Sequence, residues 1–193
     1  MEHLLAVLGS VTPPGRMSKA IASTLDAAKL KIPGLGTELL NLKDYRVSFA
    51  DGRPLDRYAD DSGKLAQRVK RADAVLICSP VYRGSITGAL KNLLDLLPIE
   101  ALRAKPCGIV AMGATNHHYL GVDWHLRDVL AWFGALVAPT SVYLSSADFV
   151  EGEPSAEAQG ELLSLIQALH RLHQIVPVAG EEFGPLPLAA RNR

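Results

Sequence analysis

Apolar residues form five short continuous runs along the chain, and segments with helically spaced apolar positions lie between and after these runs. The continuous runs cover residues 4–8, 37–42, 74–78, 106–112 and 136–144. The helically spaced segments cover residues 19–30, 64–71, 89–97, 118–134 and 155–175. Continuous apolar runs of strand length are typical of parallel strands that are buried on both faces. The pattern therefore predicts an α/β fold with a five-stranded parallel sheet, right-handed crossovers and helices on both faces.

The length of the chain fits one folded unit. A chain of 193 residues can bury about 70% of its unfolded surface in a single core. We expect one domain over residues 1–176 and, because several glycines and prolines follow, a C-terminal arm or frayed tail over residues 177–193. Inside the domain, residues 45–58 contain Gly52 and Pro54 and are predicted to form a long loop.

Charge and cysteine content narrow the class of protein. Lysine plus arginine and aspartate plus glutamate both number 20, so no overall field favours nucleic acid or an anionic membrane as a partner. Cys78 and Cys107 lie in apolar runs, where buried reduced thiols are common, so we expect neither a disulfide nor a metal site. The apolar runs are too short for a signal peptide or a membrane span. We therefore expect a cytoplasmic protein without a nucleic-acid or membrane partner.

The segment Asp73–Leu97 carries more information than any other part of the chain. It is an apolar run broken by a proline, followed by a polar turn with a glycine and then by a helical pattern. In an open parallel sheet, ligands bind outside the carboxyl ends of the strands, and a flat aromatic ligand would suit the residues at this end. These residues are Pro80, Val81, Tyr82 and Arg83. The alternative interpretation is an ordinary connection between a strand and a helix.

Small and hydroxyl-bearing residues follow the first apolar run, just before a helical segment. They are Gly9, Ser10, Thr12, Gly15 and Ser18, with Arg16 among them. Free N–H groups and the dipole at a helix N-terminus attract a phosphate, so this segment has the chemistry of a phosphate-binding loop. The glycine spacing does not match a dinucleotide fingerprint, and the absence of a G-K-S or G-K-T sequence argues against ATP or GTP. The alternative is a loop in which Ser18 simply caps a helix.

A third loop is predicted after the fourth strand. The small residues Gly113, Ala114 and Thr115 lie there, and they would let the backbone approach the edge of a ring. Strand ends of one parallel sheet lie on the same edge. A phosphate held after the first strand and a ring held after the third and fourth strands could therefore belong to one molecule.

Other chemistry finds little support in the sequence. The histidines have no carboxylate or cysteine partner at a convincing metal-binding spacing. This holds for the pair at 117 and 118, the pair at 170 and 173, and His125. No G-x-S-x-G sequence is present for serine hydrolysis. Cys78 lies within a predicted strand instead of at a helix start, where the thiol pKa would fall. Nucleophilic catalysis and a metal centre are therefore not expected.

Taken in order, these motifs resemble a known family. Three motifs are similar to those of the NAD(P)H-dependent FMN reductases of flavodoxin-like fold. They are G-S followed by R-x-S before the first helix, S-P-V-Y followed by A-L-K-N-L-L-D, and G-A-T after the fourth strand. The similarity is strongest to the FMN reductases that supply reduced flavin to two-component alkanesulfonate monooxygenases, and it covers residues 4–144. A departure is that Thr12, Pro13 and Gly15 replace the more common polar and basic residues of the phosphate loop.

The resemblance implies a role for each candidate residue. Ser10, Arg16 and Ser18 would hold the FMN phosphate, with Thr12 beside them. The isoalloxazine ring would lie against Pro80, Val81, Tyr82 and Arg83, and would be flanked by Gly113, Ala114 and Thr115. FMN and the nicotinamide carry the hydride chemistry, so the resemblance implies no catalytic acid or base from the protein.

The implied activity is hydride transfer from NADPH or NADH to FMN, with a flavin-dependent monooxygenase as a possible acceptor of the reduced flavin. Three alternatives remain open at this point. The chain could be a quinone, azo or chromate reductase with tightly bound FMN, a flavodoxin-like electron carrier, or a binding module without activity. The balanced charge weighs against an electron carrier, because such carriers usually dock through a strongly acidic face.

The predicted helix over residues 118–134 is richer in large apolar groups than one inward stripe requires. Surplus apolar surface favours an interface, so we expect a homodimer or homotetramer. The resemblance adds that alkanesulfonate-type reductases carry an extra aromatic residue in this helix, in a π-bulge at a subunit interface. Trp124 matches that position in type, although a tyrosine is usual there. The alternative is that Trp124 packs in the core or at an ordinary interface.

Overall fold

The computed structural model describes residues 1–116, 119–176, 184–187, 190 and 191. Its main sheet has the strand order β2-β1-β3-β4-β5, with β6 also paired to β4, and every pairing in it is parallel. The strands are β1 (His3–Leu8), β2 (Gly36–Asn41), β3 (Ala74–Pro80), β4 (Pro106–Met112), β5 (Leu136–Val137) and β6 (Val142–Leu144). This order is that of the flavodoxin-like fold, so the predicted fold class is confirmed.

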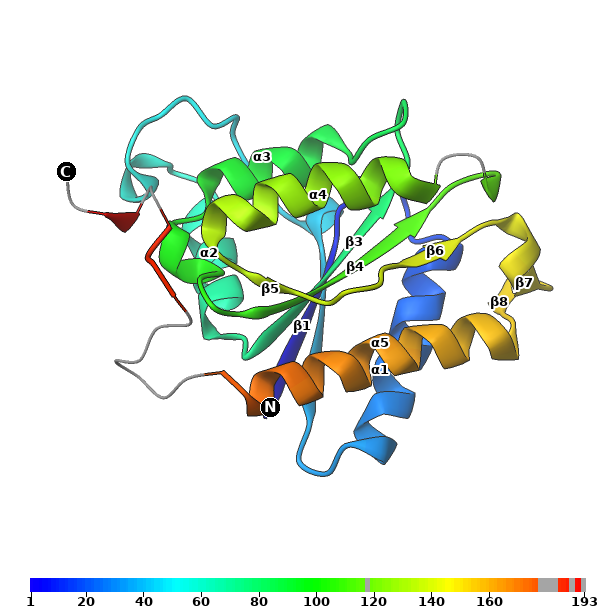
Figure 1. The fold of residues 1–193 in the computed structure, drawn as a ribbon. Helices are drawn as coiled ribbons and strands as arrows, with labels where there is room; N and C mark the ends of the chain where they lie inside the picture. Colours follow the sequence, from blue (N-terminus) through cyan, green and yellow to red (C-terminus); the bar gives the residue numbers. More distant parts are fainter. Residues whose placement is uncertain (117–118, 177–183, 188–189, 192–193) are drawn as a thin grey trace.

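Helices cover both faces of this sheet, as the apolar runs predict. The helices are α1 (Arg16–Lys31), α2 (Ser62–Arg71), α3 (Gly88–Leu96), α4 (Tyr119–Phe133) and α5 (Ala156–Gln174). In Figure 1, α2, α3 and α4 lie on one face, and α1 and α5 lie on the other. Short 3-10 turns are η1 (Leu42–Asp44), η2 (Leu55–Arg57), η3 (Ile99–Ala101) and η5 (Ser146–Asp148), and a small hairpin is formed by β7 (Phe149–Val150) and β8 (Glu153–Pro154).

Alternate residues of each central strand enter two separate cores. In β1, Leu5 and Val7 pack on the side of α2, α3 and α4, whereas Leu4, Ala6 and Leu8 pack on the side of α1 and α5. All five side chains are buried. This two-sided burial explains why the strand residues read as continuous apolar runs instead of an alternating pattern.

The fifth predicted strand is one run in the sequence but is interrupted in the structure. The prediction of one strand over residues 136–144 is wrong in its middle, because β5 and β6 are separated by residues 138–141. Pro139 has no N–H group to donate to a strand neighbour. The Arg127 guanidinium on α4 donates to the carbonyls of Ala138 and Pro139 at 3.1 and 3.0 Å, so these carbonyls are paired with a side chain instead of a strand.

The N-terminal caps of α5 and α1 differ. Ser155 is the N-cap of α5 and accepts a hydrogen bond from the Ala158 N–H at 3.1 Å. Helix α1 begins at Arg16 with Gly15 at the N-cap, so the interpretation of Ser18 as a cap is wrong. The described part of the chain contains no helix long and apolar enough to cross a membrane. The expected single domain and C-terminal arm stay a prediction, since much of residues 177–193 lies outside the described residues.

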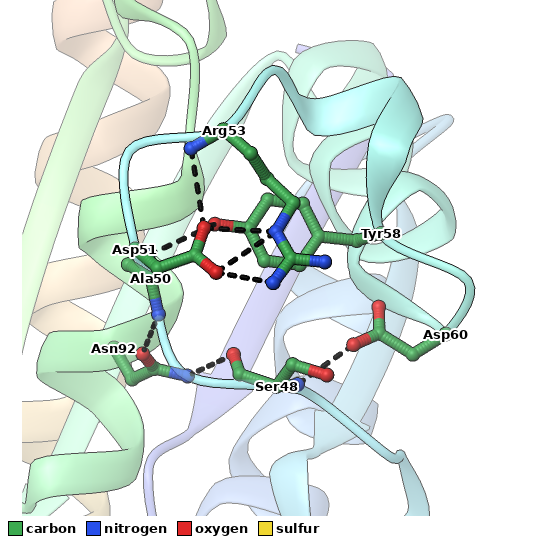
Figure 2. A network of polar contacts seen from close by, with 7 residues as sticks. All are labelled: Ser48, Ala50, Asp51, Arg53, Tyr58, Asp60 and Asn92. Atoms are coloured by element: carbon green, nitrogen blue, oxygen red, sulfur yellow. Dashed lines mark hydrogen bonds and ion pairs between the residues drawn. The ribbon is translucent and has the colours of Figure 1, made fainter.

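The predicted long loop after β2 is fixed in place by side chains, as Figure 2 shows. Asn92 on α3 accepts from the Ala50 N–H at 2.8 Å and donates to the Ser48 carbonyl at 2.9 Å. Asp60, near the end of the loop, accepts from the Ser48 N–H at 2.7 Å. A side chain from α3 and one from just before α2 therefore hold the same short stretch of backbone.

A second set of contacts closes the loop on itself. The Asp51 carboxylate forms an ion pair with Arg53 and accepts a hydrogen bond from the Tyr58 hydroxyl at 2.9 Å. The same hydroxyl accepts a hydrogen bond from the Asp51 N–H at 3.0 Å. The Arg53 guanidinium also lies 4.9 Å from the centre of the Tyr58 ring. Hydrogen bonds from Arg53 hold the pKa of Asp51 well below its ordinary 3.8. Hydrogen bonds from Ser62 and then Ser48 lower the pKa of Asp60 in the same way.

These pKa shifts predict that acid releases the loop. A carboxylate whose pKa is lower in the folded state stabilises that state above its unfolded pKa and loses this effect as the pH falls. We therefore expect the loop contacts to start weakening as the pH falls below about 4, where carboxyls of the unfolded chain protonate, and to be lost only well below that, where the lowered pKa values of Asp51 and Asp60 are reached. In 15N NMR relaxation, the heteronuclear NOE of Ser48, Ala50 and Asp51 should therefore change little between about pH 6 and about pH 4. The amides of β1 are the control, and a loop that is already mobile at about pH 4 while β1 stays rigid would contradict the prediction.

Candidate functional site

A cavity of about 220 Å³ lies at the carboxyl ends of β1, β2, β3 and β4. Six of the residues predicted from the sequence line it: Ser10, Thr12, Arg16, Ser18, Pro80 and Tyr82. Asn41 from the end of β2 and Met112 from the end of β4 also line it, and neither was among the predicted site residues. The structure thus brings the phosphate-loop candidates and part of the ring-binding candidates into one cavity.

The loop between β1 and α1 forms the polar end of the cavity. No side chain caps α1, and no acidic residue lies in its first turn. The first intrahelical bond runs from the Lys19 N–H to the Gly15 carbonyl, so the preceding N–H groups of the first turn have no helical acceptor. The hydroxyls of Ser10 and Thr12 lie 2.7 Å apart at the mouth of this turn. Unpaired N–H groups beside hydroxyls make this end suited to an anion.

Arg16 supplies the positive charge at this end. Its guanidinium donates to the Ser146 hydroxyl at 3.2 Å and lies 5.2 Å from the centre of the Phe149 ring. Both contacts come from the segment that follows β6, which therefore supports the side chain from outside the cavity. Among the described lining residues, Arg16 is the one that carries a charge, so the local field also favours an anion.

The segment that follows β3 forms a tight turn at the other end of the cavity. Tyr82 and Ser85 exchange two backbone hydrogen bonds of 2.9 and 3.0 Å around Arg83 and Gly84. The φ angles of Arg83 and Gly84 are 53° and 77°, which places both in the left-handed region typical of a type I′ turn. Arginine is uncommon there, so the turn holds it in a strained conformation. The turn leaves the Tyr82 side chain 47% exposed at the cavity.

The remaining five predicted residues lie outside the cavity lining. They are Val81, Arg83, Gly113, Ala114 and Thr115. Val81 is nevertheless hydrogen-bonded to a lining residue, because its N–H donates to the Met112 carbonyl at 2.8 Å. Gly113 follows Met112 directly, so the third loop begins at the margin of the cavity.

Thr87 joins the first loop to the end of β3. Its hydroxyl donates to the Gly9 carbonyl and accepts from the Leu90 N–H, which makes Thr87 the N-cap of α3. Its N–H donates to the Ser79 hydroxyl at 3.2 Å. Gly9 fits this contact because a Cβ there would lie only 2.8 Å from the Leu90 Cβ. Thr87 was not among the residues predicted from the sequence, because a threonine before a helix is a common cap and carries no further local signal.

The cysteines take no part in this site. Burial raises the pKa of the Cys78 thiol far above its usual range and raises the pKa of Cys107 to about 12. Both side chains are fully buried. Both thiols are therefore held in the protonated form, and the prediction that the two cysteines are buried and reduced is confirmed.

A family model and several known proteins are similar to this chain. The family model described as NADPH-dependent FMN reductase matches residues 3–149. A relative from Geobacillus thermodenitrificans named NAD(P)H-dependent FAD/FMN reductase is 44% identical over 131 residues, which cover 68% of this chain and 71% of that protein. FMN reductase (NADPH) of Escherichia coli is 31% identical over 91% of this chain and 94% of its own.

Among solved structures, the apo form of the NADH:FMN oxidoreductase EmoB superposes with a TM-score of 0.72 at 22% identity, over 93% of this chain and 92% of that one. This likeness supports the fold. The match of the family model over most of the chain and the identity to the two relatives support the family. The chain belongs to the NADPH-dependent FMN reductase family.

Proposed function

We propose that this chain reduces FMN with NADPH or NADH and that FMN binds in the cavity at the carboxyl edge of the sheet. The observation that carries the proposal is the uncapped first turn of α1, which meets Arg16 and two hydroxyls at one end of a cavity whose other end is formed by Pro80 and Tyr82. A phosphate fits the first end, and a flat ring fits the second. Bound FMN would supply the acceptor for hydride, and the protein would supply binding and orientation.

At the phosphate end, Ser10, Thr12 and Ser18 would donate hydroxyl hydrogen bonds, and Arg16 would add a charge-assisted bond. Two prolines limit this end, because Pro13 and Pro14 have no N–H to donate. Because Arg16 is the one cation among the described lining residues and the loop offers few donors, we infer modest affinity for FMN. A flavin that dissociates after reduction suits an enzyme that passes it on, and we propose a flavin-dependent monooxygenase as the acceptor.

At the ring end, Pro80 and Tyr82 would contact the isoalloxazine directly, and Val81 and Arg83 would shape the turn beside it. Gly113, Ala114 and Thr115 would flank the ring from the neighbouring loop. Among the described lining residues there is no carboxylate, histidine or lysine. This composition suits a reaction in which the protein moves no proton to or from the substrates, so the proposed site has no catalytic acid or base. NADPH and NADH are reductants of the cytoplasm, so we propose that the protein is cytoplasmic.

Steady-state kinetics separate this proposal from its alternatives. An FMN reductase oxidises NADPH or NADH at a rate that depends on free FMN, whereas a quinone or azo reductase retains FMN and depends on the second acceptor. An electron carrier gives no bleaching of the flavin absorbance on anaerobic mixing with either nucleotide. Measuring both nucleotides with FMN and with a quinone also establishes the preferred donor.

Arg16→Ala should weaken FMN binding about tenfold or more, because a hydrogen bond to a charged group contributes about 1.5–3 kcal/mol. The dissociation constant can be measured by quenching of flavin fluorescence, with riboflavin, which lacks the phosphate, titrated in parallel. Riboflavin affinity should be the same in the variant and the wild type.

Lys19→Ala is the matched control, since Lys19 lies on the same helix but pairs with Glu153 at 3.2 Å. It should leave FMN affinity unchanged. Equal affinity of the wild type for FMN and riboflavin would refute phosphate binding at this loop.

We further propose that α4 contributes to a homodimer or homotetramer. Val122, Leu126 and Leu130 form its buried stripe, whereas Trp124 and Trp132 are 63% and 61% exposed. The expectation that Trp124 could pack in the core is therefore wrong for the isolated chain. Residues 119–133 are α-helical throughout, so the π-bulge implied by the resemblance is absent from this described segment. Trp132 also lines a groove of about 430 Å³ between α3 and α4, which a second copy of the chain would fill.

Trp124→Ala and Trp132→Ala should each lower the oligomeric state, because tryptophan anchors in an interface carry a large share of its binding energy. Light scattering coupled to size-exclusion chromatography at micromolar concentration measures the mass. Leu30→Ala is the control, since Leu30 is 87% exposed on α1, on the opposite face of the sheet. A wild-type protein that elutes as a monomer would contradict this proposal.

A further inference from the structure

Tyr143 lies beside the proposed ring-binding edge and has no role assigned so far. It is on β6, where it pairs with Ala111 of β4. Its side chain is partly buried against the core of α2, α3 and α4. Its hydroxyl donates to the Thr115 carbonyl at 2.6 Å. Burial raises the pKa of this hydroxyl, so it stays protonated and able to donate.

Because Gly113 has no side chain, there is room beside it for the Tyr143 side chain. A Cβ on Gly113 would lie 2.0 Å from the Tyr143 hydroxyl oxygen and 3.1 Å from the ring carbon Cζ. The first distance is far inside van der Waals contact. The small residue at position 113 therefore has a structural reason within the chain, in addition to the predicted approach of the backbone to a ring.

Hydrogen bonds therefore hold the segment from Met112 to Thr115 on two sides. On one side the Val81 N–H donates to the Met112 carbonyl at 2.8 Å. On the other side the Gly113 N–H donates to the Leu144 carbonyl at 3.0 Å, and the Tyr143 hydroxyl holds Thr115 two residues further on. Of these contacts, the bond from Tyr143 is made by a side chain, so a substitution can remove it without breaking the strand pairing.

We propose that Tyr143 is a positioning residue for flavin binding, which holds the 113–115 loop in the conformation that flanks the ring. This inference rests on the proposed function, since it assigns the loop to FMN. Tyr143 acts through the Thr115 carbonyl and does not line the cavity. Its effect should appear in flavin affinity and not in the rate of hydride transfer once FMN is saturating.

Tyr143→Phe removes the hydroxyl and keeps the ring. The loss of one neutral hydrogen bond should raise the dissociation constant of FMN about threefold to tenfold. The KM for FMN should rise in parallel, while kcat at saturating FMN should stay within about twofold of the wild type, because uniform binding and not the transition state is affected. A residue that only stabilises the fold would lower the unfolding temperature without this split between KM and kcat.

Gly113→Ala provides the complementary test. The added methyl group collides with the Tyr143 hydroxyl, so it should displace the loop and weaken FMN binding by more than about tenfold. In the double variant G113A/Y143F the colliding atom is gone, and the Cζ contact of 3.1 Å can relax. FMN affinity of the double variant should therefore be higher than that of G113A alone, although Y143F by itself lowers affinity. Additive losses would overturn the proposal.

Tyr58→Phe is the control for removing a tyrosine hydroxyl elsewhere, since the Tyr58 hydroxyl donates to Asp51 in the loop after β2. It should leave FMN affinity unchanged. If the wild type binds FMN and Y143F and G113A bind it equally well, the role of Tyr143 is refuted while the proposed function stands. If the wild type binds no FMN, the proposed function itself fails.

Discussion

The hydrogen bond from the Thr87 hydroxyl to the Gly9 carbonyl fixes the relation between the two loops on which the proposed site depends. Thr87 begins α3 after the turn that would carry the ring, and Gly9 begins the loop that would carry the phosphate. Both groups are buried, so leaving the carbonyl unpaired would cost about 1–3 kcal/mol. The same hydroxyl caps α3, which is typically worth about 1 kcal/mol. One side chain thus stabilises a helix and sets the distance between the two ends of the cavity.

The parallel sheet makes this arrangement possible. The strand order places β1 next to β3 and β3 next to β4, so the loops that follow these strands meet at one edge. Helices on both faces bury the strands and leave the edge as the place where polar backbone groups are free. Among the described residues that line the cavity formed there, Arg16 is the one with a charge. A site of this composition is suited to orient a flavin nucleotide that carries its own chemistry, and it offers little to a reaction that needs an acid or a base from the protein.

Much of the fold could be predicted from the sequence, because burial on both faces makes each central strand a continuous apolar run. The run over residues 106–112 matches β4 at both ends. The fifth strand was predicted less well, because hydrophobicity does not reveal that Arg127 pairs with the carbonyls beside Pro139. The cap of α1 was also wrong, since Gly15 takes the N-cap without a side-chain bond and Ser18 lies in the first turn.

Part of the site was equally predictable, since hydroxyls, glycine and an arginine before a helix carry a local signal of phosphate chemistry. Asn41, Thr87 and Tyr143 could not be found in this way, because each acts through a contact with a segment far away in the sequence or through its place at a sheet edge. The steric reason for a glycine at position 113 could not be found either, since only the fold brings Tyr143 over it.

A crystal structure of the protein with FMN tests the proposed site most directly. We expect the phosphate to accept hydrogen bonds from the first-turn N–H groups of α1 and from Arg16, and the isoalloxazine to lie against Pro80 and Tyr82. We also expect the bond between Thr87 and Gly9 to be retained. A flavin whose phosphate points to solvent away from α1, or which occupies the groove between α3 and α4 instead, would contradict the proposed site.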